Sequence, residues 1–238
     1  MADFGAGREL AVYDLATIEY SAALDLQHRL VRARQQQQVP DSLLLLEHPP
    51  VITMGKSAVD EDILADSATL AAAGATIERI ERGGEVTYHG PGQLVGYLII
   101  DLGAYLRSLK KYVYLLEQVF VRVLAEQFDV RAGRDQEHRG VWVADEKITA
   151  IGVAVSRRIT YHGFAFNVAP DLSHFDWIVP CGIRDRGQTS VERLTGTRPD
   201  MTATKQAVAK TLAELYGFSW DGILRTQMSA HLISANAN

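Results

Sequence analysis

The only cysteine of this 238-residue chain, Cys181, lies in the stretch IVPCGI, between a proline and a glycine. A thiol is a nucleophile in its thiolate form, and a reactive cysteine needs a partly exposed, electropositive setting. A free cysteine more often serves as a small buried hydrophobic residue. The sequence around Cys181 leaves both interpretations open: an inert core residue, or a nucleophile presented by a shaped loop.

A second unusual stretch is RGGEVTYHGPGQ, residues 82–93, which contains four glycines and one proline. Glycines at this density let the backbone approach a ligand closely and direct its N–H groups toward it. A glycine-proline turn that merely joins two strands is the alternative. Arg82 and His89 would be costly to place beside such a turn, so the stretch favours a binding loop.

Three other chemistries lack their motifs. MGKS, residues 54–57, ends like a phosphate-binding loop, but Pro50 stands where that motif has its first glycine. No Gly-x-Ser-x-Gly stretch is present to indicate a serine hydrolase of that type. The spacing of His162, His174 and Cys181 matches no zinc motif, so we predict no metal.

Composition bounds the setting of the chain. The net charge of −5, from 24 Lys+Arg against 29 Asp+Glu, argues against a nucleic-acid partner in general. One cysteine excludes an internal disulfide and favours the reducing cytosol. The first ten residues contain Asp3, Arg8 and Glu9 rather than the apolar core of a secretory signal, and no apolar run is long enough for a bilayer. We therefore expect a cytoplasmic protein with no membrane partner.

Apolar periodicity predicts mixed helices and strands without an internal repeat. Apolar residues four apart from Ile18 to Leu30 predict an amphipathic helix. The β-branched and aromatic residues of 140–168 predict a meander of antiparallel strands. Further helices are expected at 63–73, at 113–128 and around 208–215, and further strands at 42–48, 51–55, 75–81 and 94–102. With no linker between two halves, we expect one α+β domain over 1–238, its core at about 10–217, and a short helix or mobile end after Gly217.

Three stretches together, RGGEVTYHGPGQLVGYLIIDL, EKITAIGVAVSRRITYHGFAFNV and VPCGI, closely resemble the lipoyl(octanoyl) transferases. The resemblance covers most of the chain, from SLLLLEHPPVITMG to VERL. It implies a mixed β-sheet core flanked by helices, similar to the catalytic domain of biotin and lipoate protein ligases. It also implies transfer of an octanoyl group from an acyl carrier protein to a protein lysine, the first step of endogenous protein lipoylation.

The resemblance implies roles for particular residues. Cys181 would form the acyl thioester, and Lys147 would tune its thiol. The residues implied to bind the acyl group are Arg82, Gly83, Gly84, Glu85, Val86, Thr87, Tyr88, His89, Ala150, Ile151, Gly152, Gly163, Phe164 and Ala165. Ala150 departs from the family, since many members have serine there, and the change would remove a hydroxyl from the pocket wall.

Elementary chemistry is consistent with these roles. Exchange of one thioester for another is nearly balanced in free energy and amide formation is downhill, so no ATP is needed, and we expect no cofactor. A thiol with a pKa of about 8.5 needs a nearby cation to become a thiolate at neutral pH. From the residues alone, Lys147 could equally be a solvated turn residue, and His89 is the other candidate base. For Phe164 and Phe166, plain strand packing and pocket lining are equally favoured.

The resemblance implies two protein partners. The donor would be octanoyl-acyl carrier protein, whose phosphopantetheine holds the acyl group, and the acceptors would be apo lipoyl domains of 2-oxoacid dehydrogenase E2 subunits and of the glycine cleavage H protein. Acidic partners would need a local basic surface, for which the candidates are Lys110, Lys111, Arg131, Arg134, Arg157 and Arg158. Two alternatives stay open: an ATP-dependent lipoate or biotin ligase of the same fold, and a non-catalytic acyl-binding module. A monomer is favoured.

Overall fold

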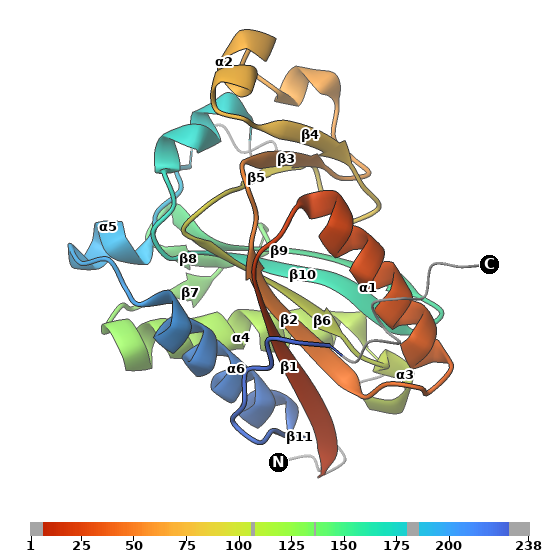
Figure 1. Ribbon diagram of the computed structural model, residues 1–238. Helices are drawn as coiled ribbons and strands as arrows, with labels where there is room; N and C mark the ends of the chain where they lie inside the picture. Colours follow the sequence, from red (N-terminus) through yellow and green to blue (C-terminus); the bar gives the residue numbers. More distant parts are fainter. Residues whose placement is uncertain (1–6, 106–107, 136, 180–185, 229–238) are drawn as a thin grey trace.

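The structure, a computed structural model, describes residues 7–105, 108–135, 137–179 and 186–228. Within these ranges the chain forms one large mixed sheet with helices on both faces and one small sheet, which lies at the top of the view in Figure 1. The predicted α+β fold with a mixed sheet flanked by helices is confirmed.

The large sheet has eight strands in the order β11-β1-β2-β6-β10-β9-β8-β7. Their bounds are β1 Arg8–Thr17, β2 Asp41–Glu47, β6 Gln93–Ile99, β7 Gly133–Arg134, β8 Val141–Val143, β9 Glu146–Ser156, β10 Ile159–Asn167 and β11 Phe218–Ser219. Strand β1 is parallel to both neighbours, and all other pairs are antiparallel. The middle strands β2, β6 and β10 are almost wholly buried because helices cover both of their faces.

Helices α1 Tyr20–Gln35 and α4 Leu109–Phe128 pack against opposite faces of this sheet, and α6 Met201–Tyr216 packs beside α4. On the α1 face, Leu26 and Leu30 contact a core that includes Leu44 from β2. On the other face, Phe120 and Leu212 share a core with the alternate side chains of the same strands. Two shorter helices, α3 Leu102–Tyr105 and α5 Val191–Thr195, complete the helices beside the large sheet.

The small sheet has the order β4-β3-β5, with bounds β3 Val51–Met54, β4 Thr76–Arg79 and β5 Val86–His89. Helix α2 Ser67–Ala72 and the 3-10 turns η1 Asp60–Asp62 and η2 Leu172–Trp177 surround it. Its core contains Tyr88, Phe175 and Ile178. Because β5 leads directly into β6, the glycine-rich segment is fixed between the two sheets.

Most predicted elements are confirmed, and four details differ. The helix expected at 63–73 is only α2, because Asp66 accepts a hydrogen bond from Thr69 N (2.7 Å) and starts the helix there. The binding loop contains a strand, β5, and the N-terminal residues supply β1, which sequence reasoning missed. After Gly217, Phe218–Ser219 form β11, the described residues 220–228 contain no helix, and the rest of the tail expected as a short helix or mobile end lies outside the described residues.

We expect Phe120→Ala to lower the free energy of unfolding by about 3–5 kcal/mol. Phe120 is fully buried on α4, with its ring centroid 4.6 Å from that of Phe164 and 5.1 Å from that of Phe166. Leu109→Ala on the same helix, where the side chain is 41% exposed, should cost less than about 1 kcal/mol. Chemical denaturation of both variants measures the difference; equal losses would mean that the ring cluster contributes nothing special.

Candidate active site

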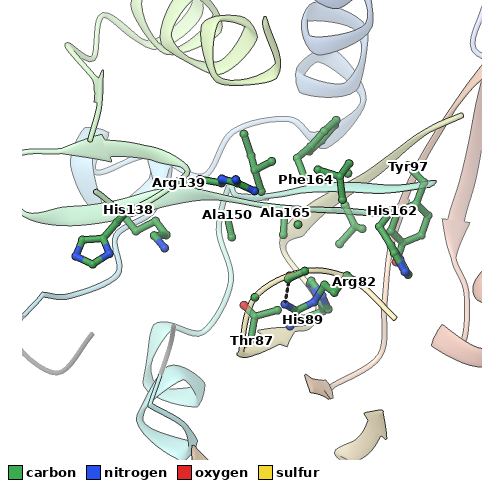
Figure 2. Close-up of a pocket in the computed structure, with 18 of the residues that line it drawn as sticks. Arg82, Thr87, His89, Tyr97, His138, Arg139, Ala150, His162, Phe164 and Ala165 are labelled. Carbon is green, nitrogen blue, oxygen red and sulfur yellow. Dashed lines mark hydrogen bonds between the residues drawn. The ribbon is translucent and has the colours of Figure 1, made fainter. Parts of the chain in front are cut away.

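A cavity of about 350 Å³ lies between the α1 face of the large sheet and the glycine-rich segment (Figure 2). Its lining residues are Tyr20, Arg82, Gly83, Gly84, Thr87, His89, Val95, Tyr97, Glu137, His138, Arg139, Lys147, Ala150, Ile151, Gly152, Val153, His162, Gly163, Phe164 and Ala165. Figure 2 shows Ala150 and Ala165 on the sheet, with Arg82, Thr87 and His89 across from them. His138 lies at one end of the cavity, and Tyr97 and His162 lie at the other.

The floor of the cavity is made of small residues in register. Ala165 of β10 pairs with Ala150 of β9 and with Val95 of β6, and Gly163 pairs with Gly152. The glycine-rich segment forms the roof of the cavity. Gly83 N donates to Val153 O at 3.4 Å, so this roof contacts β9 directly. These small side chains leave an apolar slot between floor and roof.

The glycine-rich segment packs closely on a glycine of β9. A Cβ atom at Gly152 would come within 3.0 Å of the Arg82 side chain. The Arg82 guanidinium donates from Nη2 to Thr53 O (2.8 Å) and from Nη1 to Gly83 O (3.2 Å). Arg82 thereby ties the roof to the small sheet.

A β-bulge brings Lys147 to the same face as Ala150. Val141 pairs with Thr149 but Trp142 pairs with Lys147, so β9 has one more residue than β8 at this point. Ile148 accordingly packs into the core on the α4 side, whereas Ala150 faces the other way. Without the extra residue, strict alternation would place Lys147 and Ala150 on opposite faces.

Lys147 is buried at the His138 end of the slot, with 4% of its surface exposed. Its Nζ lies 4.9 Å from the centroid of the Trp142 ring, where the ring quadrupole attracts an ammonium. Lys147 N donates to Gly187 O, and Thr189 N donates to Lys147 O, both at 3.0 Å. The segment that follows Cys181 in sequence therefore runs alongside Lys147. The surface-turn interpretation of Lys147 is wrong.

The opposite end of the slot is polar. Tyr97 Oη lies 2.7 Å from His48 Nε2, and His48 Nδ1 lies 2.7 Å from Ile18 O. His162 has a left-handed backbone, with φ of 57°, and its N–H donates to Gln27 Oε1 at 2.7 Å. In Figure 2 its side chain points to the same side as Tyr97.

Burial keeps the histidines of this end neutral at physiological pH. It lowers the pKa of His162 to about 3 and that of His48 to about 4. It also lowers the pKa of His89 to about 3, with a smaller contribution from repulsion by His48. Removal from water disfavours the charged imidazolium in each case.

A buried chain of hydrogen bonds joins His89 to the segment that contacts Lys147. His89 Nδ1 lies 2.7 Å from Gln93 Oε1, and Gln93 Nε2 donates to Asn167 Oδ1 at 2.9 Å. Asn167 Nδ2 donates in turn to Thr189 O at 3.0 Å. Because Thr189 is bonded to Lys147, this chain fixes the segment beside Lys147 from the side of the glycine-rich loop.

Most of the predicted site residues line the cavity, but some do not. Cys181 lies outside the described residues, between Val179 and Arg186. Of the predicted acyl-binding set, the residues that line the cavity are Arg82, Gly83, Gly84, Thr87, His89, Ala150, Ile151, Gly152, Gly163, Phe164 and Ala165. Glu85, Val86 and Tyr88 do not line it. Their binding roles stay predictions.

Two aromatic side chains of the predicted set, Tyr88 and Phe164, pack in hydrophobic cores, although Phe164 also lines the cavity. Tyr88 is buried in the core of the small sheet, where its hydroxyl lies 2.8 Å from His174 Nδ1. The Phe164 ring points away from His89 (Figure 2) and packs on Phe120 of α4, so this ring belongs to the core. Phe166 lies in the same core.

Sequence reasoning missed several lining residues. Tyr20, His138 and Arg139 lie outside the glycine-rich stretch, and Val95 and Tyr97 lie on β6 just after it, where the sequence indicates only a buried strand. For His162, the sequence raises only a role as a metal ligand. Its burial in a strand together with a left-handed φ is a structural signal that no sequence pattern gives.

The predicted docking residues form no single basic surface. Lys110 and Lys111 begin α4 and Arg131 follows its end; the helix has 20 residues, about 30 Å in length. Arg134 is paired with Glu117, and Arg158 with Asp101 at 3.0 Å. Within the described ranges, no helix has the length and apolar character to cross a bilayer. Nor do the described His, Cys, Asp and Glu side chains gather in a group of three that could hold a metal.

Comparison with known proteins matches this site and fold to one family. The sequence model of the lipoyl protein ligase A/B catalytic domain matches residues 19–213. The octanoyltransferase of Caldicellulosiruptor saccharolyticus is 47% identical over 88% of this chain and 89% of that protein. The octanoyltransferase of Desulforamulus reducens is 45% identical over 88% of this chain and 92% of that protein.

Solved structures agree on the fold. A putative lipoate protein ligase from T. acidophilum with bound lipoic acid superposes with a TM-score of 0.73 at 16% identity, covering 94% of this chain and 92% of that one. A lipoate-protein ligase A bound with ATP gives 0.71 at 16% identity, covering 95% and 92%. The biotin protein ligase of Aquifex aeolicus with biotin and ATP gives 0.54 at 15% identity, covering 87% and 70%.

The chain therefore belongs to the lipoyl protein ligase A/B catalytic-domain family. Within that family it groups with the octanoyltransferases, and it is an acyltransferase of this kind.

The buried histidines predict a loss of stability in acid. Because the folded pKa of His162 is lowered to about 3, the unfolded chain takes up this proton first as pH falls below about 6.5. Between pH 7 and pH 5 this linkage should remove about 2 kcal/mol for each such histidine. His162→Asn, which tolerates a left-handed backbone, should lose about 2 kcal/mol less than wild type over this interval.

Denaturation curves at pH 7 and pH 5 provide the measurement. Tyr161→Phe, at the neighbouring position, does not change a group that titrates in this range and should lose as much stability as wild type. An acid sensitivity of His162→Asn equal to that of wild type would show that His162 is not buried as a neutral group.

Proposed function

We propose that this acyltransferase moves an octanoyl group from octanoyl-acyl carrier protein to the lysine of apo lipoyl domains through a thioester on Cys181. The acceptors would include 2-oxoacid dehydrogenase E2 subunits and the glycine cleavage H protein. The observation that supports this most directly is the buried Lys147 at the end of an apolar slot, hydrogen-bonded to the segment that follows Cys181. No ATP and no metal enter the reaction.

Lys147 supplies the positive charge that a cysteine needs nearby in order to be a thiolate at neutral pH. An ammonium near a thiol favours the thiolate, and each unit of pKa depression corresponds to about 1.4 kcal/mol. The Trp142 ring and the bonds to Gly187 and Thr189 hold Lys147 in place without flexible surface contacts. A cation fixed in a slot of low polarity acts more strongly than one in water.

The reaction then has two balanced steps. In the first, the Cys181 thiolate attacks the donor thioester carbonyl, and the phosphopantetheine sulfur leaves as a thiol after it takes a proton from the Lys147 ammonium. In the second, the acceptor amine attacks the Cys181 thioester, neutral Lys147 takes the amine proton, and Cys181 leaves as the thiolate, so that the starting state of both residues is restored. The acyl chain lies in the slot over Ala150 and Ala165, where each buried methylene contributes about 0.8 kcal/mol.

The two partners bring different groups to the same end of the slot. Arg139 lines the cavity near His138, and Arg186 packs over the Trp142 ring at 5.0 Å. We assign the docking of the acidic carrier protein to this end rather than to Lys110 and Lys111, since the thioester must reach Lys147. The archaeal ligase of similar fold was solved as a bipartite enzyme with an E2 lipoyl domain, at 17% identity.

We expect the chain to gain the mass of one octanoyl group on Cys181 when it is mixed with octanoyl-acyl carrier protein without ATP. Cys181→Ser is nearly isosteric and should abolish transfer while it leaves the thermal unfolding curve unchanged. Intact mass and peptide mapping make the measurement. Full activity of Cys181→Ser would rule out the covalent route, and activity only with ATP would favour a ligase.

We expect Lys147→Ala to slow alkylation of Cys181 at neutral pH, because loss of the cation raises the thiol pKa toward about 8.5. The rate should recover as pH rises. Lys147→Arg keeps the charge but cannot release a proton, so it should retain rapid alkylation and lose transfer.

His89→Ala is the matched comparison for the pH dependence of alkylation. Since the Nδ1 of His89 is already engaged by Gln93, this variant should leave the alkylation profile close to that of wild type. A profile that moves with His89→Ala and not with Lys147→Ala would assign the base to His89 instead.

A further inference from the structure

The end of the slot opposite Lys147 has the wrong chemistry for the methyl group of a long acyl chain. Four polar or aromatic-polar side chains line the cavity there, and we call them the distal polar cluster: Tyr20, His89, Tyr97 and His162. Each is at least nine-tenths buried. A cavity that only had to hold hydrocarbon would end in apolar side chains.

His162 gives the clearest sign that this cluster binds something. It is 2% exposed, and among the described residues its Nε2 atom has no hydrogen-bond partner. A buried polar atom left unpaired costs about 1–3 kcal/mol. The left-handed φ of 57° at His162 is a second local cost, and it is what turns this side chain toward the cavity, out of the alternation of β10. An unpaired buried nitrogen and a strained backbone at the same cavity-lining residue indicate a ligand group that hydrogen-bonds to His162 Nε2.

The charge state of the cluster narrows the chemistry of that group. Burial lowers the pKa values of His89 and His162 to about 3, so both rings are neutral at pH 7. A neutral imidazole offers one donor and one acceptor, and a tyrosine hydroxyl offers both. The Arg82 guanidinium nearby donates to Thr53 O and Gly83 O in the roof. An uncharged hydroxyl, which donates and accepts, fits such a cluster.

The geometry of β9 sets the length of acyl chain that spans the slot from Lys147 to the distal polar cluster. From Lys147 to the level of Gly152, which pairs with Gly163 and through it with Tyr97, β9 advances five positions with one taken up by the bulge. At about 3.3 Å per residue this is about 13 Å. An extended octanoyl chain spans about 9 Å, and van der Waals contact adds about 4 Å. With the acyl carbonyl at the level of Lys147, the eighth carbon reaches the edge of the cluster, and a ninth atom enters it.

We propose that the distal polar cluster makes the enzyme prefer a hydrogen-bonding atom over a methyl group at the ninth position, so that 8-hydroxyoctanoyl is a better donor group than nonanoyl. This inference rests on the proposed acyl transfer. The two groups have the same number of chain atoms, so size does not separate them. Nonanoyl places a methyl group against the unpaired Nε2 of His162, whereas the hydroxyl pairs with this atom.

The test is a competition between nonanoyl- and 8-hydroxyoctanoyl-acyl carrier protein for one apo lipoyl domain, read by mass spectrometry of the acceptor. The product ratio gives the ratio of kcat/KM directly. We expect the hydroxylated group to be favoured by about tenfold, the discrimination that one well-paired buried hydrogen bond provides. An apolar or open end would favour nonanoyl, and a ratio at or below one overturns the proposal.

Tyr97→Phe removes one hydroxyl from the cluster and keeps the ring. It should reduce the preference severalfold. Tyr161→Phe removes a hydroxyl from a neighbouring part of β10, where it donates to Glu81 at 2.8 Å outside the cavity, and should keep the wild-type ratio. Equal ratios in the two variants would place the discrimination elsewhere than in the cluster.

A binding measurement separates this inference from the proposed function. Calorimetry with free nonanoic and 8-hydroxyoctanoic acids should show tighter binding of the hydroxylated acid to the wild-type chain, by a similar factor. Absence of octanoyl transfer with this preference intact would overturn the proposed function alone. Normal octanoyl transfer with tighter binding of nonanoic acid would overturn the inference alone.

Discussion

The bulge in β9 is the constraint on which the site depends, because it alone lets Lys147 and Ala150 face the same cavity. One extra residue, Ile148, turns into the core on the α4 side and shifts the alternation of the strand by one position. At this position β9 also forms a parallel bridge with the segment of Gly187 to Thr189. This segment hydrogen-bonds to both the N–H and the C=O of Lys147. The bulge therefore directs the Lys147 side chain into the cavity. The apolar part of the slot, over Ala150, follows it along β9.

A second break in alternation closes the slot at its other end. The left-handed residue His162 turns its side chain to the face that Ala165 and Gly163 define, where Tyr97 and His48 already form a buried hydrogen bond. Between the two breaks β9 and β10 are regular, and their small side chains leave room for a chain of limited length. The regular sheet thus supplies the slot, and its two irregular positions supply the chemistry at each end.

Those irregular positions also mark the limit of what the sequence could predict. The helices α1, α4 and α6 and the strands β2, β6 and β10 follow from periodicity, and the cavity-lining role of Arg82, His89 and Ala150 follows from glycine spacing and family resemblance. Register is a property of strand pairs, so the bulge that buries Lys147 cannot be seen in EKITAIG alone. Likewise, alternation leaves the two faces of β10 equivalent for Phe164, and only the packing of Phe120 of α4 against its ring places that ring in the core.

The ionisable groups at the two ends of the slot differ in kind, and this difference has a chemical consequence. At the distal end, removal from water keeps His48, His89 and His162 uncharged. At the other end the Lys147 ammonium lies against the Trp142 ring, which attracts a cation without neutralising it. An anion that forms near Lys147 therefore meets a positive charge in a poorly solvated setting, where the attraction is weakened far less than in water. At the distal end the imidazoles are neutral, and the Arg82 guanidinium, whose charge acts on His162, donates hydrogen bonds to Thr53 O and Gly83 O. The fold thus gives the two ends of the slot different electrostatic settings.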